Sequence, residues 1–324
     1  MRQGWMMNRE LEGETLGRSR GARCFPAAHL LTLAALAAVI GCGGEERVAD
    51  GEHYPDVDVI DNMEDGTQYI LSDDGRVGLW YTYNDASPTG TQEPAVGFPM
   101  YRTRRPDGAP EPSSQVIPRE CGSGPFAGEQ ECTFVARTWG TGQRGWGAGM
   151  GVDLNGEGGA KNPIDGSMYG GIGFFVTGDV RGGSLRVNIQ DVRTTPESAA
   201  AADRRDIPRC ESYLADGTPT GRCNDHYGVV VTGIQKNVWR WVTIPFACMK
   251  AQAFGYPSSP TSGGLPGENV LRRDAMVGIQ FQVTGADPAD TGMPSSPVAP
   301  FDFSIDNLSF LDTNVVNDTT QCVF

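Results

Sequence analysis

Two short segments near the middle of the chain carry side chains suited to hold a polar ligand. Asp191 and Arg193 lie two residues apart, a spacing that places both on one face of a β-strand. Asp225, His226 and Tyr227 follow in the second segment. We expect the five side chains to form a binding floor. The alternative is a buried ion pair and hydrogen-bond network that fixes a long loop to a sheet.

Aromatic residues supply a second kind of binding chemistry, a flat apolar surface. Four are candidates for such a platform: Trp80, Tyr83, Trp139 and Trp146. Each one alone is more often a core residue, because a large aromatic side chain stabilises a fold most when it is buried. Trp239 and Trp241 share a strand face by their spacing, and we interpret both as core.

The sequence offers little support for catalysis. It contains neither an H-E-x-x-H motif nor a P-loop, so zinc-protease and P-loop nucleotide chemistry lack a basis. Forty Asp and Glu residues provide many chance carboxylate pairs, and a glycosidase pair is defined by a distance that sequence does not show. We therefore expect a protein that is not an enzyme.

The cysteines divide between an N-terminal segment, which holds Cys24 and Cys42, and the rest of the chain. The remaining six are Cys121, Cys132, Cys210, Cys223, Cys248 and Cys322. Six cysteines allow 15 pairings. The economical choice pairs Cys121 with Cys132 and Cys210 with Cys223, since each pair is close together in a loop-like segment. Cys248 and Cys322 would then pair by default. No C-x-x-C pair occurs, which argues against zinc.

The N-terminal segment predicts export and lipid anchoring. Arg18, Arg20 and Arg23 precede an uncharged apolar run over residues 27–40, which at about 14 residues is too short to span a membrane as a helix. The run ends in Val39-Ile40-Gly41-Cys42, which resembles a bacterial lipobox. We expect residues 1–41 to be a signal peptide and Cys42 to be acylated, for example with palmitate. The alternative is an ordinary secretory signal that contains a cysteine.

We expect residues 42–57 to be a flexible tether and the protein to sit in the cell envelope. An Asp directly after the cysteine resembles an inner-membrane retention signal. Gly43 occupies that position here, which favours the outer membrane. The membrane would then be contacted through the lipid anchor alone.

The rest of the chain, residues 58–324, alternates between short apolar runs and Gly, Pro, Asn and Asp. Several runs place apolar and polar residues on opposite faces, as residues 185–190 and 279–283 do. This pattern predicts an all-β jelly-roll sandwich in a single domain with long loops. The predicted strands are 77–83, 133–139, 147–154, 171–177, 184–191, 227–232, 240–245, 275–283 and 301–310.

Composition limits the ligand. The chain has 26 Lys and Arg against 40 Asp and Glu, for a formal net charge of −14. This balance argues against nucleic acid, which is bound through Lys and Arg. An uncharged or cationic ligand is compatible with it.

Three groups of motifs resemble the galactose-binding-like β-sandwich of the family 11 carbohydrate-binding module and its relatives in lipoproteins of myxobacteria-like organisms. The first group is residues 59–66 and 75–80, the second is 191–196, 223–228 and 239–246, and the third is 301–310. The resemblance spans nearly all of residues 58–312. It implies a module that binds a glycan or polysaccharide along a concave sheet face, with the candidate residues above as that face.

The same resemblance implies a structural calcium ion, with Glu64 and Asp306 as its carboxylate ligands. Calcium binds six to eight hard oxygens, which two carboxylates and backbone carbonyls can supply. The alternative is two solvated acids at strand ends.

Two other functions stay open at this point. Jelly-roll polysaccharide lyases use His, Tyr and Arg, a set that His226, Tyr227 and Arg193 would match. A structural envelope lipoprotein without a glycan ligand would use the same residues as internal hydrogen-bonding partners.

Overall fold

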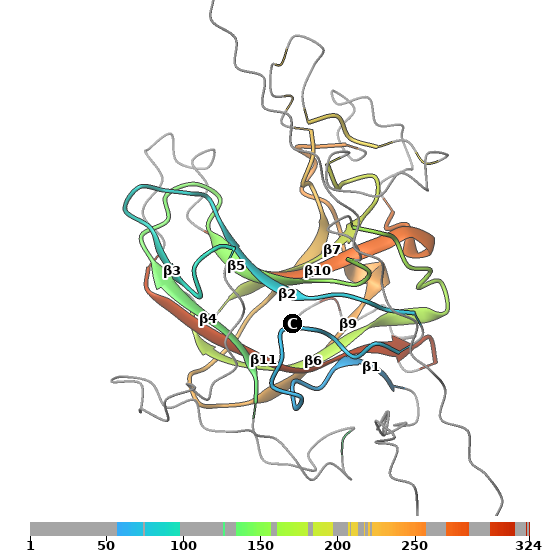
Figure 1. The fold of residues 1–324 in the computed structure, drawn as a ribbon, viewed down its shortest axis with the longest axis horizontal. Coiled ribbons are helices and arrows are strands. Elements are labelled where there is room, and N and C mark those ends of the chain that lie inside the picture. The colour runs from blue at the N-terminus through green and yellow to red at the C-terminus, as the bar shows by residue number, and fades with distance from the viewer. Residues whose placement is uncertain are drawn as a thin grey trace, which may run out of the picture. The chain divides into compact units, whose positions relative to one another are not determined.

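The structure, a computed structural model, describes most of the chain from residue 57 onward, and all of its described residues belong to one unit, residues 50–324 (Figure 1). They are residues 57–73, 75–97, 126, 134–156, 161–180, 184–196, 207, 209–212, 217, 220, 222–256, 270–284, 299–314, 322 and 324.

Two antiparallel sheets face each other (Figure 1). The first has the order β3-β4-β11-β6-β9 with β1 also paired to β11: β1 Val57–Asp61, β3 Thr91–Glu93, β4 Ala136–Thr141, β6 Tyr169–Asp179, β9 Arg240–Pro245 and β11 Phe301–Asp312. The second has the order β2-β5-β10-β7-β8: β2 Trp80–Asn84, β5 Ala148–Asp153, β7 Leu185–Asp191, β8 Tyr227–Val231 and β10 Met276–Val283.

This arrangement is the predicted jelly-roll β-sandwich, and each of the nine predicted runs contains or overlaps a strand. The pattern did not predict β3, which is only three residues long, or β1 as a strand. Helical structure in the described part is confined to short 3₁₀ turns such as Phe246–Cys248 and Arg273–Ala275.

The core fills the space between the sheets, because every strand except the short polar β3 contributes apolar residues to it. Phe281 of β10 is at the centre, stacked on Trp80 of β2 at 6.1 Å between ring centroids and edge-on to Phe174 of β6 at 5.1 Å. Tyr169 stacks on Phe310 at 4.5 Å. Burying each such ring stabilises the fold by roughly 1.5–3 kcal/mol.

A second apolar cluster covers the outer face of the six-stranded sheet. Phe126 and Phe175 are buried there, and Trp241 packs edge-on against both, with ring centroids at 5.4 and 4.9 Å. Trp239 is half-buried beside them. Trp239 and Trp241 therefore pack in this outer cluster rather than between the sheets.

Strand β11 connects most of the first sheet. It pairs with β6 along one side, and along its other side with β4 through Phe301 to Ile305 and with β1 through Leu308 to Leu311. Between these two partners the strand bulges, and Asn307 adopts a left-handed backbone with φ of 48°.

Candidate functional site

The outward face of the five-stranded sheet is polar, in contrast to its inward face. Residues alternate along each strand, so the neighbours of the core residues point away from the core. The register aligns the outward residues in two rows that cross the strands. The first row is Tyr83, Gly149, Gln282 and Arg186, and the second is Tyr81, Gly151, Gln280 and Asn188.

A pocket of about 580 Å³ lies over these rows. In Figure 1 the β2–β3 connection rises at one side of this sheet, and the segments near β7 and β8 rise at the other. The pocket is lined by Tyr83, Trp146, Arg186, Asn188, Cys223, Asn224, His226, Gln252, Phe254, Gln280 and Gln282. We call this pocket the groove; its lining extends across the sheet from Tyr83 of β2 to His226, which directly precedes β8.

Two glycines of β5 allow the tyrosines of β2 to lie close to the sheet. A Cβ at Gly151 would meet the ring and hydroxyl of Tyr81 at 2.8 Å, and one at Gly149 would meet the Tyr83 hydroxyl at 2.9 Å. Real Cβ atoms do not approach so closely, so any larger residue would displace these rings. The glycines therefore allow an aromatic surface to form at this end of the groove.

Three aromatic rings continue one another along this surface. Tyr81 and Tyr83 have ring centroids 6.0 Å apart, and Tyr83 stacks on Trp146 at 5.7 Å. Trp146 is 51% exposed, so its ring is open to a ligand. The Tyr83 hydroxyl has no hydrogen-bond partner among the described residues, and burial raises its pKa well above the ordinary value. It stays protonated and able to donate.

Planar polar groups fill the middle of the groove and are held by one another. Arg186 Nε donates to Asn188 Oδ1 at 2.8 Å, and Asn188 Nδ2 donates to Gln282 Oε1 at 3.2 Å. Gln282 Nε2 donates to the Trp146 carbonyl at 2.9 Å, and Gln280 Nε2 donates to the Tyr81 hydroxyl at 3.3 Å. This network links β7 to β10 and to the aromatic surface, and it fixes the orientation of each group.

His226 lies at the β8 end of the groove as a neutral imidazole. Burial, reinforced by the charges of Lys161 and Arg186, lowers its pKa to about 3. Its Nε2 is 3.1 Å from Gln190 Nε2 and its Nδ1 is 2.8 Å from Thr194 Oγ1. Because the amide nitrogen of Gln190 donates, Nε2 accepts and the proton resides on Nδ1.

Lys161 closes one flank of the floor. Its Nζ pairs with Asp153 Oδ1 at 2.7 Å, donates to Tyr81 and Gln190, and lies 4.6 Å from the Tyr81 ring centroid. Burial opposes its charge, but Tyr81 and Asp153 outweigh burial and raise the Lys161 pKa. The ammonium group is therefore charged and neutralised locally.

Three members of the predicted binding floor do not line the groove. Asp191 and Arg193 form an ion pair at 2.9 Å, with Asp191 fully buried, just where β7 ends. Arg193 Nη2 also donates to the Tyr227 hydroxyl at 2.9 Å and to the Val270 carbonyl. The prediction that they form a binding floor is wrong, and the alternative, a buried network that anchors a loop, is what the structure has.

Asp225 is also buried and does not line the groove itself, but it positions a segment that does. Its two carboxylate oxygens accept hydrogen bonds from the backbone N–H groups of Gln252 and Gly255, at 2.7 and 2.9 Å. These bonds position the segment that brings Gln252 and Phe254 to the pocket. Of the first predicted set, His226 alone reaches the pocket wall.

The aromatic candidates separate in the same way. Tyr83 and Trp146 line the groove. Trp80 does not, because it points into the core, where its Nε1 donates to Asp61 at 2.7 Å. Trp139 belongs to β4 of the other sheet and stacks under the Arg137 guanidinium at 4.7 Å from its ring centroid.

Sequence reasoning missed several residues that line the groove: Arg186, Asn188, Asn224, Gln252, Phe254, Gln280 and Gln282. It also missed Tyr81, which lies beside the groove on β2. Five of them occupy the polar positions of alternating strands, and the alternation of residues 185–190 and 279–283 predicts one packed and one solvated side. The signal that could have found them is planar polar side chains repeated at i and i+2 on neighbouring strands.

Two of the predicted disulfides are confirmed. Cys210 bonds to Cys223, which lines the groove just before Asn224, and Cys248 bonds to Cys322. Cys42, Cys121 and Cys132 lie outside the described residues. No helix in the described part is long and apolar enough to cross a membrane.

Glu64 and Asp306 lie near the place where β1 and β4 meet along β11. Glu64 Oε1 accepts from the Phe134 N–H at 3.2 Å, and Asp306 Oδ1, which is buried, accepts from the Asn307 N–H at 2.8 Å. Within the described ranges, no group of three or more His, Cys, Asp or Glu is arranged to hold a metal ion. Calcium binding by these two carboxylates stays a prediction.

Fold and groove together define a jelly-roll β-sandwich with an aromatic and polar groove on one sheet face. No family model matches the chain, and no curated protein matches it. Among solved structures, the family 11 carbohydrate-binding module of cellulase Lic26A-Cel5E of Clostridium thermocellum is 13% identical, with 79% of this chain and 94% of that chain covered and a TM-score of 0.37.

Two further structures are similar at the same level. The family 11 module from Clostridium thermocellum in complex with a β-1,3-1,4-mixed-linked tetrasaccharide is 12% identical, covering 72% of this chain and 95% of that chain, with a TM-score of 0.30. The family 30 module of the cellulase Cel9D-Cel44B of Clostridium thermocellum is 12% identical, with 56% of this chain and 77% of that chain covered and a TM-score of 0.29. Likeness this distant supports no conclusion about what this chain binds.

Proposed function

We propose that the protein is a non-catalytic module that binds a carbohydrate chain in the groove on the five-stranded sheet. The observation that carries the proposal is the stacked pair of rings Tyr83 and Trp146, which lines the pocket beside a fixed set of amides and a guanidinium. Aromatic faces pack against the C–H faces of sugar rings, while planar amides and guanidinium groups hydrogen-bond hydroxyls in pairs. The groove volume is within the range of ligand sites.

The arrangement favours binding over catalysis. The pocket lining contains no Asp or Glu among the described residues, whereas glycosidases place two carboxyl groups about 5–10 Å apart across the bond they cut. The set considered for a lyase is divided, because Arg193 and Tyr227 bond each other in the interior and His226 alone reaches the pocket.

We also propose that the module is displayed at the cell envelope, in the outer membrane, through an acyl group on Cys42. The support is the sequence of the N-terminal segment, with its short apolar run and lipobox-like end.

Affinity electrophoresis against a panel of soluble neutral and acidic polysaccharides tests the binding function. We expect the wild-type protein to be retarded by at least one of them, and Trp146→Ala and Tyr83→Ala to weaken that binding by about tenfold or more, since each removes a stacking surface.

Trp139→Ala is the matched control, because Trp139 is a half-buried tryptophan on the other sheet. It should bind like the wild type. Retardation by none of the polysaccharides would contradict the proposal and leave a structural lipoprotein, and release of unsaturated or reducing ends would identify an enzyme.

A further inference from the structure

Arg186 is a cationic group on the groove wall, and no carboxylate among the described residues pairs with it. Its Nε donates to Asn188, and its Nη2 donates to the carbonyl oxygens of Lys250 at 3.2 Å and His226 at 3.5 Å. All three acceptors are neutral. Its Nη1 makes no hydrogen bond to any described residue, so this nitrogen has donors to offer a ligand.

No carboxylate of the described residues forms an ion pair with Arg186. The acid whose charge acts on it is Asp225, whose two oxygens accept backbone hydrogen bonds from Gln252 and Gly255. Burial lowers the Arg186 pKa, with the charge of Asp225 acting the other way. Removing a guanidinium partly from water costs free energy when no carboxylate pairs with it. An anion that accepts its hydrogen bonds offsets this cost best.

The other titratable groups of the groove do not supply that anion. His226 is neutral, and Lys161 is paired with Asp153. The described pocket lining holds Arg186 as its one charged side chain. The groove is therefore locally cationic within a chain whose formal net charge is −14.

We propose that the groove selects a glycan that carries an anionic substituent, a carboxylate or a sulfate, whose oxygens accept hydrogen bonds from Arg186. This inference rests on the proposed carbohydrate-binding function. A guanidinium presents a planar fork of donors that matches the oxygens of such groups. Repulsion from the acidic surface is screened beyond about 8 Å at physiological ionic strength, while a half-buried pair is screened much less.

A pair of ligands that differ in charge alone provides the first test. Polygalacturonate and its carboxyl-reduced derivative share one backbone, and we expect the acidic polymer to bind about 10- to 100-fold more tightly, as a charge-assisted hydrogen bond predicts. A sulfated galactan and its desulfated form distinguish sulfate from carboxylate. These comparisons use the wild-type protein, so they do not depend on any variant folding.

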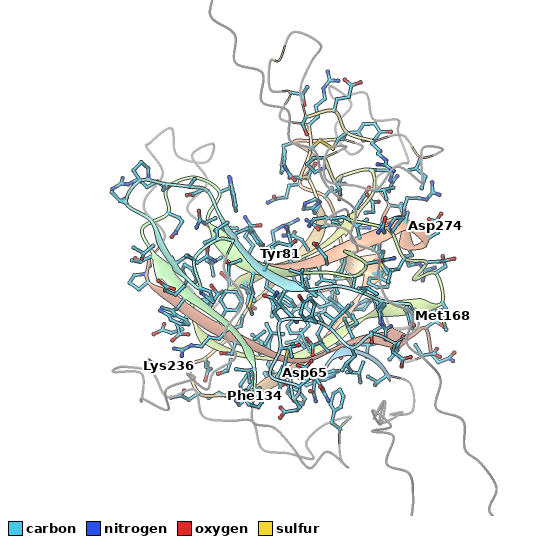
Figure 2. All side chains as sticks on the ribbon, viewed as in Figure 1. Asp65, Tyr81, Phe134, Met168, Lys236 and Asp274 are labelled. Atoms are coloured by element: carbon cyan, nitrogen blue, oxygen red, sulfur yellow. A yellow bond between two sulfur atoms is a disulfide. The ribbon has the colours of Figure 1, made fainter. Side chains whose placement is uncertain are left out.

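The variant Arg186→Gln should bind the acidic polymer no better than the neutral one, and Arg186→Lys should recover part of the difference because it keeps the charge but loses the fork. Lys236→Gln is the control for net charge. Lys236 is exposed and lies away from Tyr81, beyond the other sheet (Figure 2).

Each outcome decides between the two proposals. Preference for an acidic polymer that Arg186→Gln abolishes and Lys236→Gln retains supports both. Equal or stronger binding of the neutral polymers, unchanged in Arg186→Gln, overturns the anionic preference and leaves the carbohydrate-binding function intact. Binding of no polysaccharide at all overturns both.

Discussion

Individual groove residues are held in place by partners that do not themselves face a ligand. His226 is fixed between Gln190 and Thr194, and Arg186 is held by Asn188 and two carbonyls. A side chain with its rotamer already set loses little entropy on binding. The groove is therefore preorganised at the scale of single side chains.

His226 should make stability depend on pH. Its folded pKa of about 3 lies below the unfolded value of 6.5, so between these values the unfolded state binds the additional proton. Stability then falls as pH falls through this window, by roughly 1.4 kcal/mol per pH unit. Between pH 7 and pH 4 we expect the free energy of unfolding of His226→Gln to fall by about 3 kcal/mol less than that of the wild type.

Urea unfolding of both proteins across that range measures the difference. If the two stability profiles run parallel from pH 7 to pH 4, His226 is not the group responsible.

Gly151 should be required for the aromatic surface. In Gly151→Ala the new Cβ would meet the Tyr81 ring at 2.8 Å and the Ile279 carbonyl oxygen at 3.0 Å. We expect Tyr81 to shift, stability to fall by about 1–3 kcal/mol, and ligand affinity to fall with it. Gly156→Ala is the control, since its Cβ would meet nothing closer than 3.4 Å. Unchanged affinity in Gly151→Ala would show that Tyr81 does not contribute to the site.

At the scale of elements, the five-stranded sheet supplies the floor and the segments at its edges supply the walls. The floor is rigid because each outward side chain belongs to a strand paired on both sides, except at the edges β2 and β8. The β8 edge carries Asn224 and His226, and the adjacent Cys210–Cys223 bond ties that segment down.

The two described disulfides should therefore have different effects. Replacing Cys210 and Cys223 by serine removes a bond of sequence separation 13, and replacing Cys248 and Cys322 removes one of separation 74. Loop-closure entropy predicts stability losses of about 3 and about 4–5 kcal/mol respectively. Ligand affinity should fall mainly in the first variant, because the first bond adjoins the groove.

Thermal unfolding and titration with the bound glycan measure both quantities. Loss of affinity in the second variant alone would contradict this assignment.

Calcium is expected to act where β1 and β4 meet along β11. If Glu64 and Asp306 hold an ion, millimolar calcium should raise the unfolding temperature by several degrees, and a chelator should reverse the rise. Glu64→Ala should abolish the shift, whereas Asp65→Ala, which removes an exposed neighbouring acid, should retain it. Absence of any calcium-dependent shift in the wild type would remove the ion from this site.

At the scale of the whole molecule, charge is distributed unevenly. Residues 1–41 carry five Arg and three Glu, so the chain that would remain after cleavage at Cys42 has a formal charge of −16. The groove nevertheless presents a guanidinium that no carboxylate of the described part of the chain pairs with. Net charge describes solubility and long-range steering, while ligand choice is decided within a few ångströms.

Anchoring is a property of the whole chain and has its own test. Expressed in a Gram-negative host, the full-length protein should incorporate labelled palmitate and fractionate with the outer membrane. Cys42→Ser should remain unprocessed and unlabelled, and Cys24→Ser is the control that should be labelled normally. Equal labelling of Cys42→Ser and the wild type would contradict acylation at Cys42.

The sequence by itself determined the all-β class and nearly all strand positions, because alternation is a local property, and it favoured the pairing of Cys210 with Cys223, which are 13 residues apart. The pairing of Cys248 with Cys322, 74 residues apart, followed from the sequence only by elimination, and the structure shows the bond formed. Tertiary structure alone decided how the outward residues of different strands combine into one site. Alternation along β7 already places Asn188 on the polar face with Arg186 and places Asp191 on the apolar face with Ile189, where Asp191 pairs with Arg193. Register between strands far apart in the chain brings Tyr83, Gln282 and Arg186 into one row, and no local pattern encodes that register.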